Sequence, residues 1–207
     1  ILAKLDRQEI DILIGTQMIT KGHDFPEITL VGVLAADASL NIPDFRASER
    51  TFQILTQVSG RGGRGDQRGR VVVQTFNPGH YAIRRAQDHD YAGYYEDELP
   101  IRRELGYPPF SRLIGIHFSG LKQTEGKRAV TDIGKRIRKL AATVTDGKVD
   151  VIGPAESPLA RLRGRYRWQM LLRGPHSGPL HLLAEKVIEE RRSGLDIQVD
   201  VDPVHFM

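Results

Sequence analysis

Two arginines stand three residues apart in a glycine-rich turn, in the segment Gln57-Val-Ser-Gly60-Arg61-Gly-Gly-Arg64. Guanidinium groups are always cationic and donate hydrogen bonds in pairs, which suits the negative charge that develops on phosphate oxygens during phosphoryl transfer. Glycines let the backbone approach such a group closely. The pattern indicates a phosphate-facing site built on Arg61 and Arg64, and a helix-capping turn with solvated arginines is the plainer alternative.

A polar loop follows an apolar run near the start of the sequence, in Gly15-Thr-Gln-Met-Ile-Thr-Lys-Gly22-His-Asp24-Phe-Pro26. Thr16 and Gln17 offer short donors of the kind that contact a nucleic-acid backbone. Gly22 permits an unusual backbone conformation, and Asp24 can accept from a ribose hydroxyl or pair with an arginine. A surface loop without a function accounts for these residue types equally well, so the loop is informative chiefly together with the arginine turn.

Basic residues alternate with other residue types in one later stretch, at Arg161, Arg163, Arg165 and Arg167. In proteins that bind single-stranded DNA, cations meet phosphates and aromatic rings stack on bases. The same alternation is expected of a strand that buries Tyr166, Trp168 and Met170 on one face and exposes the arginines on the other. The two interpretations are compatible, and we predict DNA contacts from Arg163, Arg165 and Arg167.

The elements that must position the arginine turn and the polar loop follow one another in the order typical of an open parallel sheet. Short apolar runs predict strands over residues 11–15, 29–36 and 70–76, and the first is expected to be buried. Phe52, Leu55 and Val58 predict a helix over 45–59 that stops at the glycine cluster. Ligands of such sheets bind at the carboxyl ends of the strands. Since three strands are few and the sequence does not begin with Met, we expect part of this sheet to lie outside the sequence.

The second half has a different order of elements, β-α-β-β-α-β, which predicts a ferredoxin-like domain. Strands are expected over 113–118, 149–152, 166–172 and 197–201, and helices over 124–144 and 178–191. One apolar stripe marks the first of these helices: Val130, Ile133, Ile137, Leu140 and Val144. Ile197, Val199 and Val201 alternate as in a half-buried strand. Helical residues 81–105 end at the break Gly106-Tyr-Pro-Pro109, so we predict two domains, 1–105 and 106–207.

The amino-acid composition is typical of a folded protein with a hydrophobic core, and the basic pI favours binding to a polyanion. The 207 residues are 40% hydrophobic and 27% charged, which excludes a largely disordered chain. The pI of about 9.4 favours a polyanionic partner. Without cysteine there is no disulfide framework and no thiolate zinc site in the sequence. The histidines lack metal-ligand spacing and no apolar run reaches membrane length, so we expect no metal, no membrane partner and a cytoplasmic location.

Three segments, TQMITKGHDFP, LAADASLNIPDFRASER and QVSGRGGR, resemble a known family. The first and third are similar to motifs V and VI of superfamily 2 helicases. The amino-acid sequences of the three segments are most similar to those of the primosomal protein N′ family of replication-restart helicases. The later segments GRYRWQ and DVDP are similar to that family's carboxyl-terminal domain, so the resemblance covers essentially the whole chain.

The resemblance implies a partial RecA-like second helicase lobe followed by the ferredoxin-like domain. It implies that Arg61 and Arg64 reach the γ-phosphate of ATP, with Arg64 as the finger. The other implied nucleotide-binding residues are Gly22, Asp24, Gln57 and Gly60. Thr16 and Gln17 would touch the tracked DNA strand.

The resemblance also implies what such a protein binds. The full-length enzyme would use ATP and Mg²⁺ to unwind DNA from 3′ to 5′ during primosome assembly at stalled forks. It would also bind zinc, whereas no zinc is expected in the part of the protein that this sequence covers. Its partners would be forked and single-stranded DNA, single-strand-binding protein and other primosome proteins.

Some observations keep other hypotheses open. The sequence has no GxxxxGK[ST] loop and no DExH tetrad, so by itself it should not hydrolyse ATP. A non-catalytic DNA- or protein-binding module on a degenerate motor lobe is the main alternative. A different superfamily 2 motor would share the arginine turn but would lack the segment TQMITKGHDFP and the ferredoxin-like domain. Asp37, Arg46, Glu49 and Arg50 are more simply internal ion pairs than functional groups.

Overall fold

The structure, a computed structural model, describes residues 4, 7, 9–16, 28–60, 69–145 and 147–204. The chain divides into two compact units, Ile1–Leu99 and Pro100–Met207. The change from one unit to the other falls inside helix α5 (Tyr91–Glu104). The predicted division into domains at residues 105 and 106 lies just beyond the end of that helix.

In the described part of unit 1, strands β1 (Leu30–Val33) and β2 (Arg70–Val73) form a parallel pair. The register runs from Leu30 opposite Arg70 to Val33 opposite Val73. Val33 and Val73 pack against the core, and Leu30 on the other face is 61% exposed. The strands predicted over 29–36 and 70–76 are confirmed, with shorter bounds.

The strand predicted over residues 11–15 is wrong. This segment has no regular structure, and Ile12 and Ile14 are 76% and 88% exposed. A short apolar run becomes a buried strand where neighbouring strands pair with its backbone and other elements cover its faces. Neither of the two described strands of unit 1 pairs with residues 11–15.

Three described helices lie wholly in unit 1, α2 (Asp37–Leu40), α3 (Ala47–Ser59) and α4 (Tyr81–Gln87), and α5 begins in it. The predicted helix over 45–59 is confirmed as α3, and its buried residues include Phe52, Leu55 and Val58. Phe52 stacks on Tyr94 of α5 with ring centroids 4.4 Å apart. The helices therefore share one core with β1 and β2.

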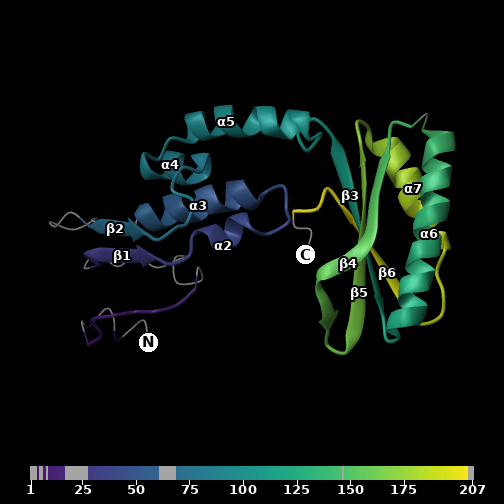
Figure 1. Cartoon of the computed structure of the whole chain (residues 1–207), viewed down its shortest axis with the longest axis horizontal. Helices are drawn as coiled ribbons and strands as arrows, with labels where there is room; N and C mark the ends of the chain where they lie inside the picture. Colours follow the sequence, from purple (N-terminus) through teal and green to yellow (C-terminus); the bar gives the residue numbers. More distant parts are fainter. Residues whose placement is uncertain are drawn as a thin grey trace. The chain divides into compact units, whose positions relative to one another are not determined.

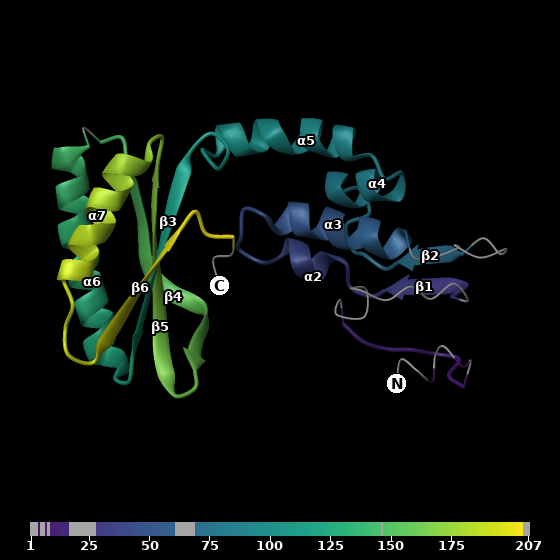
Figure 2. The same ribbon diagram turned by 180° about the vertical axis from the view of Figure 1, so that it is seen from behind.

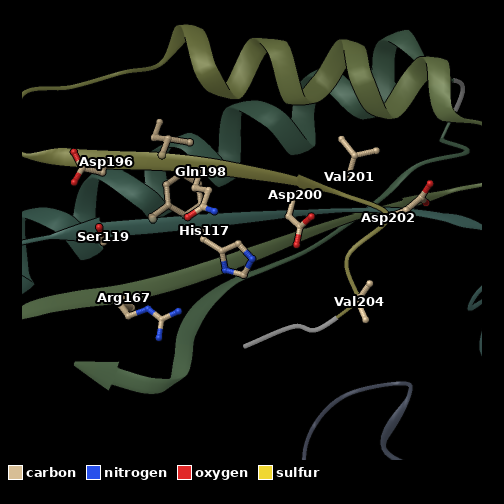
Figure 3. A pocket seen from close by; sticks show the side chains of 11 residues that line it. His117, Ser119, Arg167, Asp196, Gln198, Asp200, Val201, Asp202 and Val204 are labelled. Atoms are coloured by element: carbon tan, nitrogen blue, oxygen red, sulfur yellow. The ribbon is translucent and has the colours of Figure 1, made fainter. Parts of the chain in front are cut away.

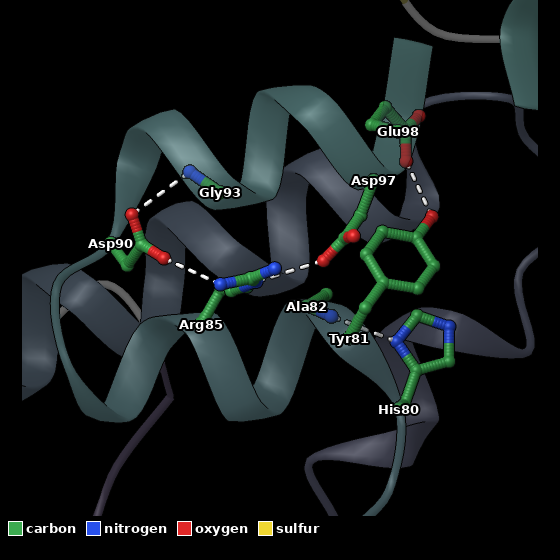
Figure 4. A network of polar contacts seen from close by, with 8 residues as sticks. All are labelled: His80, Tyr81, Ala82, Arg85, Asp90, Gly93, Asp97 and Glu98. Carbon is green, nitrogen blue, oxygen red and sulfur yellow. Dashed lines mark hydrogen bonds and ion pairs between the residues drawn. The ribbon is translucent and has the colours of Figure 1, made fainter. Parts of the chain in front are cut away.

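A polar network joins α4 to α5 (Figure 4). The Arg85 guanidinium donates to Asp97 at 2.8 Å and to Asp90 at 2.7 Å. The Tyr81 hydroxyl lies 2.5 Å from the carboxylate of Glu98, which is buried. Because these contacts span the turn between the helices, they fix α4 against α5.

Unit 2 is an antiparallel sheet covered on one face by two helices, α6 and α7 (Figures 1 and 2). The sheet has the order β4-β5-β3-β6. The elements follow the predicted order β-α-β-β-α-β: β3 (Arg112–Gly120), α6 (Gln123–Val144), β4 (Asp150–Leu162), β5 (Arg165–Gly174), α7 (Ser177–Glu189) and β6 (Leu195–Val201).

The core of unit 2 lies between the sheet and its helices. Val130, Ile133 and Ile137 of α6 are buried against it, as their spacing predicted. The predicted stripe fails at Val144, which is 44% exposed in the last turn of the helix, and Val201 is 52% exposed at the end of β6. Both residues lie at element ends, where the facing layer no longer covers them.

Strand β4 is longer than predicted, because it continues to Leu162 instead of ending at 152. Its pairing with β5 shifts between Ile152 and Ala155 and again between Glu156 and Arg161. Pro154 and Pro158 lie within these irregular parts. Proline normally argues against a strand interior, but β4 is an edge strand of the sheet, where proline and bulges are tolerated.

Candidate nucleic-acid interface

The predicted phosphate site is described in part. Gln57 is exposed in the last turn of α3, and Gly60 caps that helix by donating its N–H to the Thr56 carbonyl at 3.1 Å. Arg61 and Arg64 follow directly in the sequence but lie outside the described residues. The predicted stop of α3 at the glycine cluster is confirmed.

The predicted polar loop lies almost wholly outside the described residues. Thr16 is described and exposed, whereas Gln17, Gly22 and Asp24 are not described. The assignment of all four residues stays a prediction.

Asp37 fastens the carboxyl ends of β1 and β2 together. Its carboxylate accepts from the Thr75 hydroxyl at 2.5 Å, the Phe76 N–H at 2.7 Å and the Asn77 N–H at 3.2 Å. These bonds, the Thr75 hydroxyl first, hold the pKa of Asp37 below its usual value. Asp37 is thus a structural residue at the sheet edge where ligands of parallel sheets bind.

The acidic and basic residues after Asp37 also make internal contacts. The buried Asp44 carboxylate accepts from the Arg46 N–H and pairs with the Arg50 guanidinium, each at 2.9 Å. The Glu49 carboxylate accepts from Gln53 one helical turn later at 3.3 Å. These contacts agree with the interpretation of this segment as internally bonded.

The structure separates the four alternating arginines. Trp168 and Met170 of β5 are 3% and 2% exposed in the core, so the alternation belongs to a strand with one buried face. Arg165 donates to the Ser119 hydroxyl and carbonyl at 3.2 and 3.1 Å and pairs with Asp196 at 2.5 Å. It is therefore bonded to the sheet. Its assignment as a DNA-contacting residue stays a prediction.

Arg167 lines a concavity of about 560 Å³ on the sheet face opposite the helices (Figure 3). His117 of β3 and Asp200 of β6 line the same concavity. Burial, aided by the charge of Arg167, lowers the pKa of His117, and Asp200 acts in the opposite direction. Sequence reasoning missed His117 and Asp200. The alternation in β6 could have placed Asp200 on this face.

Arg163 lies at the tip of the hairpin between β4 and β5, with a positive φ of 50°. Arg161 lies before the tip, its guanidinium carbon 5.2 Å from the centre of the Tyr166 ring. The predicted set is therefore not one surface. Arg163 is at the tip, Arg165 is bonded into the sheet, and Arg167 borders the concavity.

No three His, Cys, Asp or Glu side chains in the described ranges are grouped so that they could hold a metal ion. None of the described helices is both long and apolar enough to cross a membrane.

Comparison with known proteins gives consistent matches. Residues 103–204 match the family described as the primosomal protein N C-terminal domain. Replication restart protein PriA of Bacillus subtilis (strain 168) is 40% identical over 212 residues, which cover 100% of this chain and 26% of that protein. The PriA proteins of Synechocystis sp. and Treponema pallidum are 41% and 40% identical and cover 99% and 96% of this chain. The chain spans 24% and 30% of their lengths.

The two units define a mixed α/β protein with a parallel pair of strands in the first unit and a four-stranded antiparallel sheet in the second. The chain belongs to the PriA family, and its residues 103–204 are that family's C-terminal domain. Among solved structures, the de novo designed protein Foldit4 covers 46% of this chain with a TM-score of 0.37 and 11% identity, a similarity too low to support an argument.

Proposed function

We propose that this chain is part of an ATP-dependent 3′ to 5′ DNA helicase that acts in primosome assembly and replication restart at stalled forks. The relatives with 40% and 41% identity are named replication restart protein PriA, and they match nearly the whole of this chain. The observation that carries the proposal is that these matches extend over nearly the whole chain, and so through the arginine turn that follows the end of α3 at Gly60.

Arg61 and Arg64 would meet the γ-phosphate of ATP, because guanidinium groups stabilise the charge that develops there. Gly22, Asp24, Gln57 and Gly60 would line the nucleotide cleft in this proposal. Thr16 and Gln17 would contact the backbone of the tracked DNA strand. Exposure of Gln57 and Thr16 supports these assignments, since both side chains are open to a ligand.

The proposal extends to the folds of the two units. Unit 1 would be part of a RecA-like lobe, and its parallel pair β1–β2, with helices α2 and α3 between the two strands along the chain, supports this proposal. Unit 2 would be ferredoxin-like, because its element order and the sheet order β4-β5-β3-β6 are those of two interleaved β-α-β units. We propose forked and single-stranded DNA, single-strand-binding protein and other primosome proteins as partners.

The sequence has neither a P-loop nor a DExH tetrad, so this chain by itself would not hydrolyse ATP. ATP, Mg²⁺ and zinc belong to the proposed full-length enzyme. What this chain would supply is cationic charge and positioning at one side of the nucleotide.

The test uses a full-length protein that contains this chain. Arg64→Ala is expected to lower DNA-stimulated ATP hydrolysis by roughly 10³-fold or more while leaving DNA affinity nearly unchanged. Arg128→Ala removes an exposed arginine of α6 and serves as the matched control. An unchanged rate in Arg64→Ala would show that the finger assignment is wrong. A wild-type protein that binds DNA but hydrolyses no ATP would support the non-catalytic module instead.

A further inference from the structure

The tip of the β4–β5 hairpin has an unusual backbone. Leu162 pairs with Arg165, and the two residues between them, Arg163 and Gly164, have φ of 50° and 81°. Two positive φ values are the mark of a type I′ turn, whose first position ordinarily holds Asn, Asp or Gly. A long side chain there is strained, and strain of this kind is found at functional positions.

The tip is separated from the body of the sheet by a bulge. Glu156 pairs with Trp168 and the next pair is Arg161 with Tyr166, so residues 157–160 of β4 lie opposite Arg167 alone. Before the bulge, β4 is tied to α6 by the ion pair of Lys127 with Glu156 at 3.6 Å. From Pro158 in the bulge to Gly164 at the tip, every residue is exposed.

Three arginines surround the tip, and they differ in direction and in whether a carboxylate pairs with them. Cross-strand partners share a face of a hairpin, so Arg161 lies on the Tyr166 face and Leu162 on the Arg165 face, with Arg163 at the apex. Within the described part of the chain, neither Arg161 nor Arg163 pairs with a carboxylate, whereas Arg165 is neutralised by Asp196. The free cations of the tip therefore face more than one direction.

This arrangement fits a groove with phosphates on both walls. The major groove of duplex DNA is about 12 Å wide and admits a two-stranded β-ribbon, whereas the minor groove, at about 6 Å, is too narrow. Leu162 is 45% exposed beside the tip, and an apolar side chain can contact the thymine methyl group there. Arg165 acts as a positioning residue, because its bonds to Ser119 and Asp196 fix the base of the tip.

We propose that the tip of the β4–β5 hairpin, residues 161–165, inserts into the major groove of duplex DNA. The cations at Arg161 and Arg163 contact phosphates on the walls of the groove, and Leu162 faces the base edges. The choice of DNA as the nucleic acid rests on the proposed function.

The test measures binding of the whole chain to a fluorescent DNA duplex, and to one of its strands alone, across a salt series. Arg163→Gly removes the charge and relieves the positive-φ strain, so the variant folds at least as well as the parent chain. We expect it to bind duplex roughly five- to tenfold more weakly, with the slope of log K against log salt reduced by about one. Its thermal midpoint should not fall. Arg128→Ala, an exposed arginine on α6, controls for the loss of one charge and should change both quantities less.

Competition with groove ligands completes the test. Methyl green, which occupies the major groove, should displace the chain, and distamycin, which occupies the minor groove, should not. The proposal is overturned if Arg163→Gly binds duplex as the parent does, if the loss is equal for the single strand, if distamycin displaces the chain, or if the chain binds no DNA. None of these outcomes touches the effect of Arg64→Ala on ATP hydrolysis, so failure of the hairpin proposal is distinguishable from failure of the proposed function.

Discussion

Arg165 of β5 and Asp196 of β6 form an ion pair of 2.5 Å across β3, the strand that lies between them in the sheet. Ser119 of β3 accepts two further bonds from the same guanidinium. One side chain therefore links three neighbouring strands at the end of the sheet that carries the hairpin tip.

Arg165→Ala should lower the free energy of unfolding of unit 2 by roughly 1–4 kcal/mol, since an exposed ion pair contributes about 0.2–1 kcal/mol and each of the two hydrogen bonds to Ser119 about 0.5–1.5 kcal/mol. Urea unfolding followed by tryptophan fluorescence measures this, because Trp168 is the single tryptophan and is buried in unit 2. Arg167→Ala, on the same strand but without a described ion pair, should change stability by less than about 0.5 kcal/mol. Equal losses in the two variants would contradict the bonded role of Arg165.

Two glycine substitutions should have opposite signs. A Cβ added at Gly126 of α6 would lie 2.4 Å from the Trp168 ring, so Gly126→Ala should destabilise unit 2 by about 1–3 kcal/mol through overpacking. At Gly178 of α7 a Cβ meets nothing within 4 Å, so Gly178→Ala should stabilise by up to about 1 kcal/mol. The same fluorescence assay compares them. If Gly126→Ala does not destabilise unit 2, the close packing of Trp168 on Gly126 is wrong.

His117 should make unit 2 less stable in mild acid. Its pKa in the folded chain lies below the ordinary value of 6.5, so the unfolded chain binds the proton first as pH falls. The stability is therefore complete above that value and declines as pH drops below it, towards the folded pKa. Among the charged groups of the concavity, Arg167 strengthens this effect and Asp200 opposes it.

Urea midpoints at pH 7.5 and pH 5.5 test the role of His117. His117→Gln should reduce the loss of stability between the two pH values, while Gln198→Ala, a change at a non-titrating residue of the same concavity, should leave it as in the parent chain. A loss of the same size in His117→Gln would show that other groups cause the acid sensitivity.

Tyr81→Phe should destabilise unit 1 by about 1–3 kcal/mol, because the buried carboxylate of Glu98 loses a hydrogen-bond donor. Thermal unfolding followed by far-ultraviolet circular dichroism measures the change. Tyr95→Phe on α5 is the matched control, since Tyr95 is 51% exposed, and it should be nearly neutral. A neutral Tyr81→Phe would mean that the bond to Glu98 does not fasten α4 to α5.

The order of elements was largely readable from the sequence, because periodicity and chain breakers are local. The spacing of Phe52, Leu55 and Val58 predicted α3, and the glycines after Ser59 predicted its end. In unit 2 every predicted strand and helix is present. Where prolines interrupted the pattern, the length of β4 was underestimated, since an edge strand tolerates them and the edge position depends on pairing.

By itself, the sequence determined the family resemblance, the order of elements and the residue types at the proposed sites. The tertiary structure decided which apolar residues are covered and which arginines are free. Ile12 and Ile14 are exposed because no described strand pairs with their segment, and an apolar run does not encode its own partners. Arg163 and Arg165 are two positions apart and look equivalent in the sequence. They differ because Ser119 and Asp196, distant along the chain, are brought beside one of them by strand register, which local sequence does not specify.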